Sequence, residues 1–258
     1  IGPIMLLIPE LKKLPFVPSP VRTDAKIQIT SVLVAIGALA LFQAGASHVG
    51  RWNTALLVAI FIGSLGVTAW STKALMPRGF LRMAPGIPAI VGMRGVVAGA
   101  FFAAEIYVPL ALQEIRGTSV ALSGGVLTAA TITWFAGSWL QGSHKLKYSR
   151  QQVLFAGVLL TCLGIALTPV AVFVPSSIMV AALVASVVWG IAAFGMGMCF
   201  PTLGVLMLDQ SPDEEHARHS ASLQMSDSFG VIIATALAGS VLALASVQQG
   251  IDSKTFIT

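Results

Sequence analysis

The amino-acid sequence predicts an all-α membrane protein that crosses the bilayer several times, and three observations support this prediction. Apolar residues make up 56% of the 258 residues and charged residues only 10%, whereas a soluble domain carries about 25% charged residues. The apolar residues form runs long enough to cross a hydrocarbon core, which takes about 20 helical residues. The charged residues gather between these runs. A soluble fold is excluded because its surface would be too poor in charge.

Apolar windows divide the chain into one partial and seven full helical spans. The partial span is Ile1–Pro9, the end of a helix. The full spans are Ile27–Ala46, Thr54–Ser71, Pro88–Leu112, Val120–Leu140, Gln152–Val174, Ile178–Leu208 and Leu223–Ala245. None of them alternates apolar and polar residues as a barrel strand does. Helices are the other structure that satisfies the backbone in lipid.

The basic residues of the loops alternate between the two sides of the predicted bundle. One side holds Lys12, Lys13, Arg22, Lys26, Lys73, Arg78, Arg82, Lys145, Lys147, Arg150 and Arg218. The other side holds Arg51, Arg116 and Lys254. Eleven against three is the bias of the positive-inside rule, so the first side is predicted to face the cytoplasm. The net charge of +5 is therefore a topology signal and not a sign of nucleic-acid binding.

Two connecting segments have a composition of their own. Residues 10–26 form a basic linker broken by three prolines, which is typical of a connector. Ser211-Pro212-Asp213-Glu214 resembles a helix start, with Ser211 as N-cap, so the last helix should begin two or three turns before it enters lipid. The chain opens inside an apolar run without an initiator Met. We therefore expect a piece of a longer protein.

Several motifs follow one another in a characteristic order. Leu75-Met76-Pro77-Arg78-Gly79-Phe80-Leu81-Arg82 leads into Gly86-Ile87-Pro88-Ala89. Gly137-Ser138-Trp139-Leu140-Gln141-Gly142 precedes Lys145, Lys147 and Arg150, and Gly195-Met196-Gly197-Met198 precedes Pro201. In this order the motifs resemble the major facilitator superfamily, specifically its fourteen-helix drug:proton antiporter branch. Gln141 stands where that family usually has an Asp.

The resemblance implies a partial major-facilitator-type helical bundle. Residues 1–9 would end the sixth helix, 10–26 would be the cytoplasmic linker, and 27–71 the two helices that this branch inserts between its halves. Residues 72–87 would be a cytoplasmic loop, 88–248 five helices of the C-terminal half, and 249–258 an extracytoplasmic tail. An N-terminal half and a final helix would lie outside the chain.

Glu105 is the sharpest functional signal, because it lies near the middle of an apolar span. A carboxylate at that depth is costly, so such residues usually line a cavity or bind protons. Pro109, four residues on, cannot donate to the carbonyl of Glu105, which predicts a kink. The alternative is a carboxyl that pairs structurally with a neighbouring helix or an interfacial group.

Three other polar residues within the spans are candidates for a function. Arg94 precedes Glu105 by eleven residues, about 16 Å along one helix face, so the two cannot pair. It either snorkels to the headgroups or neutralises a partner in the missing half. Asp227 and Gln224 share a face near the cytoplasmic entrance of the last span. Asp227 is a second proton-coupling candidate, although a structural role is favoured there.

Aromatic and flexible positions complete the candidate set. Phe101, Phe102, Tyr107, Trp134 and Gln224 would line an apolar substrate cavity, although Trp134 fits a packing role better. Gly195 and Gly197 make their helix pliable, and Pro201 should free the carbonyl of Gly197 and break the helix, as a gating helix requires. Small residues at every fourth position, such as Gly137 and Gly230, predict tight helix packing.

The resemblance implies a secondary active transporter in a bacterial cell membrane that exports lipophilic compounds in exchange for protons. Its partners would be membrane lipids, a small lipophilic substrate, protons and the N-terminal half. The sequence has no nucleotide-binding loop, zinc-type spacing or nucleophile elbow, so we expect no cofactor, no metal and no enzymatic activity. The alternatives are an uptake carrier or lipid flippase on the same scaffold, and a membrane subunit that scaffolds a complex.

Overall fold

A computed structural model describes residues 25–48, 52–143, 147–174 and 176–248, and these residues form helices and connecting turns, with no strand among them. The predicted partial span, most of the basic linker and the predicted tail lie outside these residues. The helices are α2 (Ala25–Ser47), α3 (Thr54–Leu75), α4 (Ile87–Arg116), α5 (Val120–Gly142), α6 (Arg150–Phe173), α7 (Ile178–Gln210) and α8 (His216–Gln248). Each of the seven predicted full spans is therefore a helix, in confirmation of the predicted fold class.

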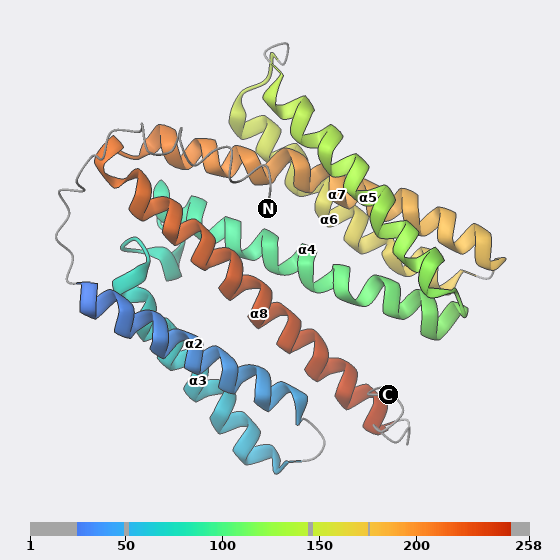
Figure 1. Cartoon of the computed structure of the whole chain (residues 1–258), viewed down its shortest axis with the longest axis horizontal. Helices are drawn as coiled ribbons and strands as arrows, with labels where there is room; N and C mark the ends of the chain where they lie inside the picture. Colours follow the sequence, from blue (N-terminus) through green and yellow to red (C-terminus); the bar gives the residue numbers. More distant parts are fainter. Residues whose placement is uncertain (1–24, 49–51, 144–146, 175, 249–258) are drawn as a thin grey trace, which may run out of the picture.

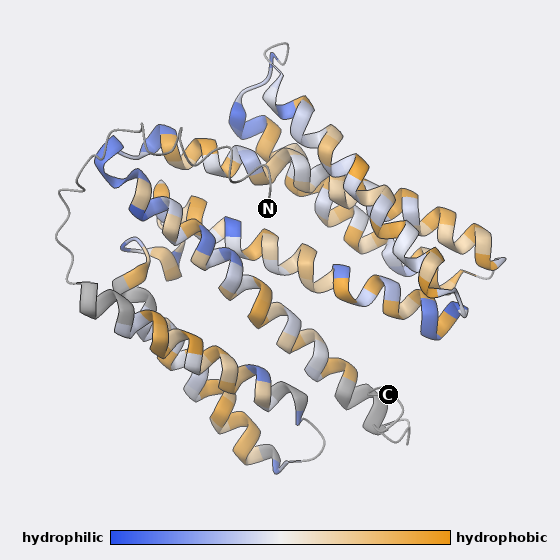
Figure 2. Ribbon diagram, in the orientation of Figure 1, coloured by the Kyte–Doolittle hydropathy of each residue, from blue (hydrophilic) through white to orange (hydrophobic). Residues whose placement is uncertain are grey.

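Five of these helices, α4 to α8, are long and apolar enough to cross a membrane. The apolar stretches of α2 and α3, Thr30–Gly45 and Ala55–Ser71, are shorter. Figure 2 shows apolar residues spread along the helices and hydrophilic residues gathered at their ends. Large apolar side chains such as Ile62, Phe135 and Phe155 are exposed, as expected of surfaces that face lipid.

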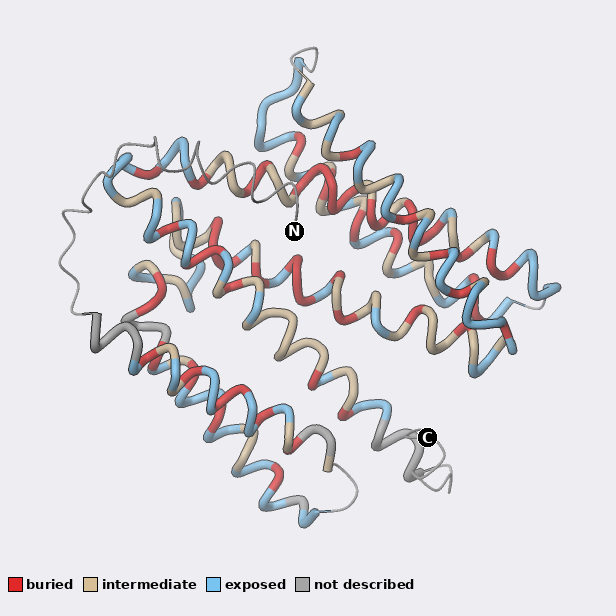
Figure 3. The backbone as a smooth tube through the Cα atoms, viewed as in Figure 1, coloured by how far each residue is buried: buried red, intermediate tan, exposed pale blue. Residues whose placement is uncertain are grey.

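The helices form two groups that meet at α8 (Figure 1). Helices α5 and α6 both pack on α7, and α4 packs on α8 and more lightly on α5, α6 and α7. The α2–α3 hairpin lies on the opposite side of α8, which α2 contacts. Buried residues are most frequent along α7, as Figure 3 shows. Helix α7 is thus the central helix of its group.

Glycines allow close contacts between helices of the bundle. A methyl group on Gly157 of α6 would lie 2.8 Å from the carbonyl oxygen of Gly195 in α7. A methyl group on Gly99 of α4 would lie 2.6 Å from the carbonyl oxygen of Gly230 in α8. Both distances are shorter than van der Waals contact, so only glycine allows these backbones to approach as they do.

The role of one capping residue differs from the sequence-based prediction. Ser211 does not cap the last helix; it is the C-cap of α7, and its hydroxyl contacts Nδ1 of His219. The short 3₁₀ turn Asp213–Glu215 follows, and α8 begins at His216. The last helix does begin about two turns before Leu223, as predicted. Ser211 was misassigned because its side chain bonds to a histidine eight residues on, which no local capping pattern reveals.

Gly137 and Gly125 of α5 offer a matched test of the glycine contacts. A methyl group on Gly137 would collide with the carbonyl of Phe194 in α7, whereas nothing lies within 4 Å of one on Gly125. We expect Gly137→Ala to destabilise the protein by about 1–3 kcal/mol through overpacking. Gly125→Ala should leave stability unchanged or raise it slightly, since alanine favours the helix. Thermal unfolding in detergent measures both, and equal melting temperatures for the two variants would contradict the packing argument.

Candidate functional site

An ion pair joins α4 to α8 inside the bundle. Nε of Arg94 lies 2.9 Å and 3.2 Å from the two carboxylate oxygens of Asp227. The side chains are only 13% and 16% exposed. Nη1 of Arg94 also donates to the carbonyl of Phe200 at 2.5 Å, and its guanidinium carbon lies 3.2 Å from the centroid of the Phe200 ring. One arginine therefore holds a carboxylate, a carbonyl and an aromatic face on two other helices.

The ion pair lies beside the closest approach of α4 and α8. Gly95 follows Arg94, and a methyl group there would lie 2.7 Å from the carbonyl oxygen of Ser226, which precedes Asp227. The hydroxyl of Ser226 donates to the carbonyl of Val91 at 2.6 Å. The local sequence Arg-Gly on one helix and Ser-Asp on the other thus places the two backbones close enough for the charges to meet.

The structure gives Arg94 a partner that neither sequence-based interpretation named. Its guanidinium pairs with Asp227 of the same chain. The sequence could not reveal the pair because Arg94 and Asp227 are 133 residues apart. Both were singled out as charges within apolar spans, but Asp227 was weighed as a residue near water. Its burial against Arg94 shows a different environment.

Five rings from α4, α5 and α7 form an aromatic cluster of Phe101, Phe102, Trp134, Trp189 and Phe200. Phe101 stacks on Trp189 with centroids 4.8 Å apart. Trp134 lies 5.5 Å from Phe101 and 5.8 Å from Phe200. Phe101 and Trp189 are fully buried, whereas Phe102, Trp134 and Phe200 are partly exposed. The prediction that Phe101 lines a cavity is therefore wrong, because its ring packs in the core.

Sequence reasoning missed Trp189 and Phe200, the two α7 members of the cluster. They are eleven residues apart, about three helical turns, and so share one face of α7. That spacing was the available signal. It did not identify the partners, because the face that α7 turns toward α4 depends on the glycine contacts of Gly195 and Gly197 with α6 and α5.

Glu105 lies on α4, about 16 Å along the axis from Arg94 and within about one turn of the middle of the helix. Its side chain is partly exposed. Within the described part of the chain it has neither a hydrogen bond nor an ion pair. Phe101 and Phe102 precede it by one turn, so Glu105 shares a face of α4 with these two members of the aromatic cluster. The structural alternative, a carboxyl paired with a neighbouring helix, is not seen among the described residues.

The remaining cavity candidates lie apart from the cluster. The hydroxyl of Tyr107 donates to the carbonyl of Thr235 in α8 at 3.3 Å. Tyr107 also borders a separate apolar cavity of about 250 Å³ between α4 and α6. Gln224 is exposed and borders another cavity of about 250 Å³, between α2 and α8. Gln224 therefore has different surroundings from Asp227, which pairs with Arg94 of α4, although the two are three residues apart.

The predicted hinge residues lie in unbroken helices. Helix α4 continues through Pro109 and α7 through Pro201, so the predicted break at Pro201 is wrong. The carbonyl of Gly197, which Pro201 leaves without its usual helical donor, accepts a hydrogen bond from the hydroxyl of Ser138 in α5 at 3.1 Å. Gly195 and Gly197 make close contacts with α6 and α5. A role as hinges stays a prediction.

A double-mutant cycle tests the ion pair. Asp227→Asn leaves the Arg94 charge buried and Arg94→Gln leaves that of Asp227, so each single variant should lose about 3–5 kcal/mol of stability. The double variant should lose clearly less than the sum, because neither charge remains. Thermal unfolding in detergent provides the four stabilities. Additive losses would show that the two residues stabilise the bundle independently.

Comparison with known proteins is consistent with this architecture. The family model described as Major Facilitator Superfamily matches residues 67–235, which include α4 to α7, most of α8 and the end of α3. No curated protein and no solved structure matches the chain. The match covers Arg94, Glu105, the aromatic cluster and Asp227, together with four of the helices long and apolar enough to cross a membrane and most of the fifth. The chain belongs to the major facilitator superfamily.

Proposed function

We propose that the protein is a secondary active transporter that exports lipophilic compounds in exchange for protons, by alternating access, in a bacterial cell membrane. Secondary transport itself follows from the family. Proton coupling is supported by one observation: Glu105 is a carboxylate near the middle of α4 that has no partner among the described residues. A charged carboxylate in that position is costly, and binding a proton removes the charge, so such a group can couple proton uptake to a change of conformation.

The contrast with Asp227 sharpens the assignment. Asp227 accepts two hydrogen bonds from Nε of Arg94, so its charge is already balanced inside the bundle. Binding a proton there would leave the arginine charge buried without its partner, which is unfavourable. Binding a proton to Glu105 would leave no such charge without its partner among the described residues. Of the two candidates that the sequence offered, we therefore assign proton binding to Glu105 and helix pairing to Asp227.

The partly exposed rings of the aromatic cluster support a lipophilic substrate. Phe102, Trp134 and Phe200 come from three different helices, and their centroids lie 5.8 to 6.3 Å from one another. Such a surface offers large apolar contact area with few polar groups to desolvate. Phe102 of this surface lies one turn from Glu105. Binding of substrate at the rings and binding of a proton at Glu105 would then exclude each other, as an exchange of the two requires.

The α2–α3 hairpin supports membership of the fourteen-helix branch. Its helix α2 packs on α8, so the hairpin lies beside the five-helix group, which consists of α4 to α8. The family match begins at residue 67, near the end of α3. We propose that α2 and α3 are the two helices inserted between the halves of the transporter. The N-terminal half would then form the other wall of the proposed substrate cavity, opposite α4.

Replacement of Glu105 tests proton coupling. In proteoliposomes with an imposed pH gradient, Glu105→Gln should reduce dye transport to the level of protein-free vesicles, because glutamine cannot take up a proton. Glu105→Asp should retain part of the activity. Glu114→Gln is the matched control, since Glu114 is exposed at the end of the same helix, and it should transport like the unmodified chain.

Transport by Glu105→Gln at the rate of the unmodified chain would refute the assignment. In vesicles of known orientation, the direction of dye movement separates export from uptake. Movement of a labelled phospholipid between leaflets would instead identify a flippase. Absence of any solute flux, together with a stable stoichiometric partner, would favour a scaffold subunit.

Trp134 and Trp139 of α5 test the aromatic surface. Trp134 belongs to the aromatic cluster, whereas Trp139 is 69% exposed. We expect Trp134→Leu to weaken binding of a lipophilic dye about tenfold, through loss of ring contacts. Trp139→Leu should leave affinity unchanged. Fluorescence titration of the purified protein measures both affinities, and equal affinities would remove the cluster from the substrate pathway.

A further inference from the structure

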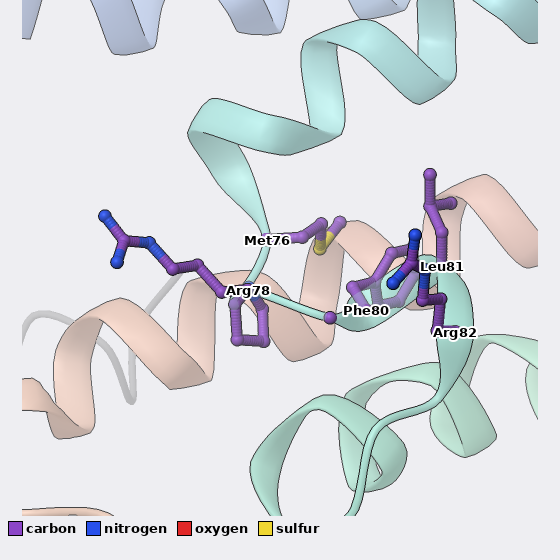
Figure 4. A pocket seen from close by; sticks show the side chains of 7 residues that line it. Met76, Arg78, Phe80, Leu81 and Arg82 are labelled. Carbon is purple, nitrogen blue, oxygen red and sulfur yellow. The ribbon is translucent and has the colours of Figure 1, made fainter.

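The connection between α3 and α4 is an ordered turn (Figure 4). Gly79 adopts a left-handed conformation (φ 87°), and a single 3₁₀ turn, Phe80–Arg82, follows it. The carbonyl of Gly79 accepts backbone hydrogen bonds from Arg82 at 3.0 Å and Ala84 at 3.2 Å. Phe80 packs against the buried residues where α3, α4, α7 and α8 meet. The turn is thus fixed to the bundle by its backbone and by one aromatic side chain.

Two arginines of this turn differ from the other arginines that the structure describes. Arg94 pairs with Asp227, Arg150 with Asp209 and Arg218 with Glu215, while Arg116 donates to Ser176. Arg78 and Arg82 are exposed and, in the described part of the chain, have no hydrogen-bond or ion-pair partner. Arg78 extends away from the turn, and Arg82 lies beside Leu81 (Figure 4). Two positive charges without a partner among the described residues are therefore held on one turn.

Exposed apolar side chains accompany these charges. Leu81 is 64% exposed and Met83, directly after the turn, is 48% exposed. Residues 76–82 also line a cavity of about 410 Å³ with both polar and apolar surface. Cations without a partner among the described residues, next to exposed apolar groups at the connection of α3 to α4, match the boundary between headgroups and acyl chains. A soluble anion would use the arginines and leave Leu81 and Met83 in water.

We propose that this turn, residues 76–83, binds anionic phospholipids at the membrane face predicted to be cytoplasmic. Arg78 and Arg82 bind headgroup phosphates, and Leu81 and Met83 lie at the acyl boundary. Arginine suits this role because its planar guanidinium can donate two hydrogen bonds to one phosphate. Since the turn links the α2–α3 hairpin to α4, bound lipid would hold the hairpin and the five-helix group at the same depth. The proposal does not depend on the solute or on proton coupling.

Native mass spectrometry of the purified full chain tests the proposal by titration with phosphatidylglycerol or phosphatidylcholine. The unmodified chain should prefer phosphatidylglycerol. Each arginine near an anionic surface contributes about fivefold to binding, so Arg78→Gln with Arg82→Gln should weaken phosphatidylglycerol binding about 25-fold. Phosphatidylcholine binding should not change. Arg78→Lys with Arg82→Lys should retain most of the preference, because the charges remain.

Arg116→Gln with Arg150→Gln is the charge-matched control, since these arginines already have protein partners. It should bind phosphatidylglycerol within about twofold of the unmodified chain. Equal weakening in the control would reduce the effect to net charge and overturn the proposal. So would unchanged binding by the Arg78/Arg82 double variant. Displacement of phosphatidylglycerol by excess inorganic phosphate would identify a site for free phosphate and overturn the lipid assignment.

Discussion

The bundle depends on the close approach of helix backbones at glycine. Between helices in lipid there is little hydrophobic driving force, so association rests on van der Waals packing and interhelical hydrogen bonds. Contacts at Gly157 and Gly195 join α6 to α7, and contacts at Gly99 and Gly230 join α4 to α8. These contacts also fix the rotation of each helix. They thereby decide which side chains face inward, including the ion pair and the aromatic cluster.

The two intramembrane carboxylates show how environment separates chemically similar groups. Asp227 lies beside a glycine contact and is held there by Arg94. Glu105 lies further along α4, on a helix face without an ionic partner among the described residues. Asp227 therefore contributes to the contact between α4 and α8. Under the proposed function, Glu105 is the carboxylate that binds the proton, because it has no partner among the described residues that would lose its counter-charge.

The sequence was sufficient to predict the elements of the fold and insufficient to predict their partners. Apolar run length and loop charge located every helix from α2 to α8 within a few residues, because the bilayer imposes both signals locally. Arg94 and Asp227 were found as charges in apolar spans, yet their pairing depends on a crossing between helices far apart in sequence. Phe101 was assigned to a cavity for the same reason: its helix face was known, but not the ring of Trp189 that covers it.

The hydrogen bond from Ser138 to the carbonyl of Gly197 has a mechanical consequence. Pro201 leaves that carbonyl without a donor from its own helix, so α7 relies on α5 to satisfy its backbone. Sliding α5 along α7 by one turn would leave a bare carbonyl in an apolar medium, which costs several kcal/mol. Helices α5 and α7 are therefore expected to move as one rigid unit. Within this part of the chain, α4 and α8 would then be the helices that move relative to the unit of α5 and α7.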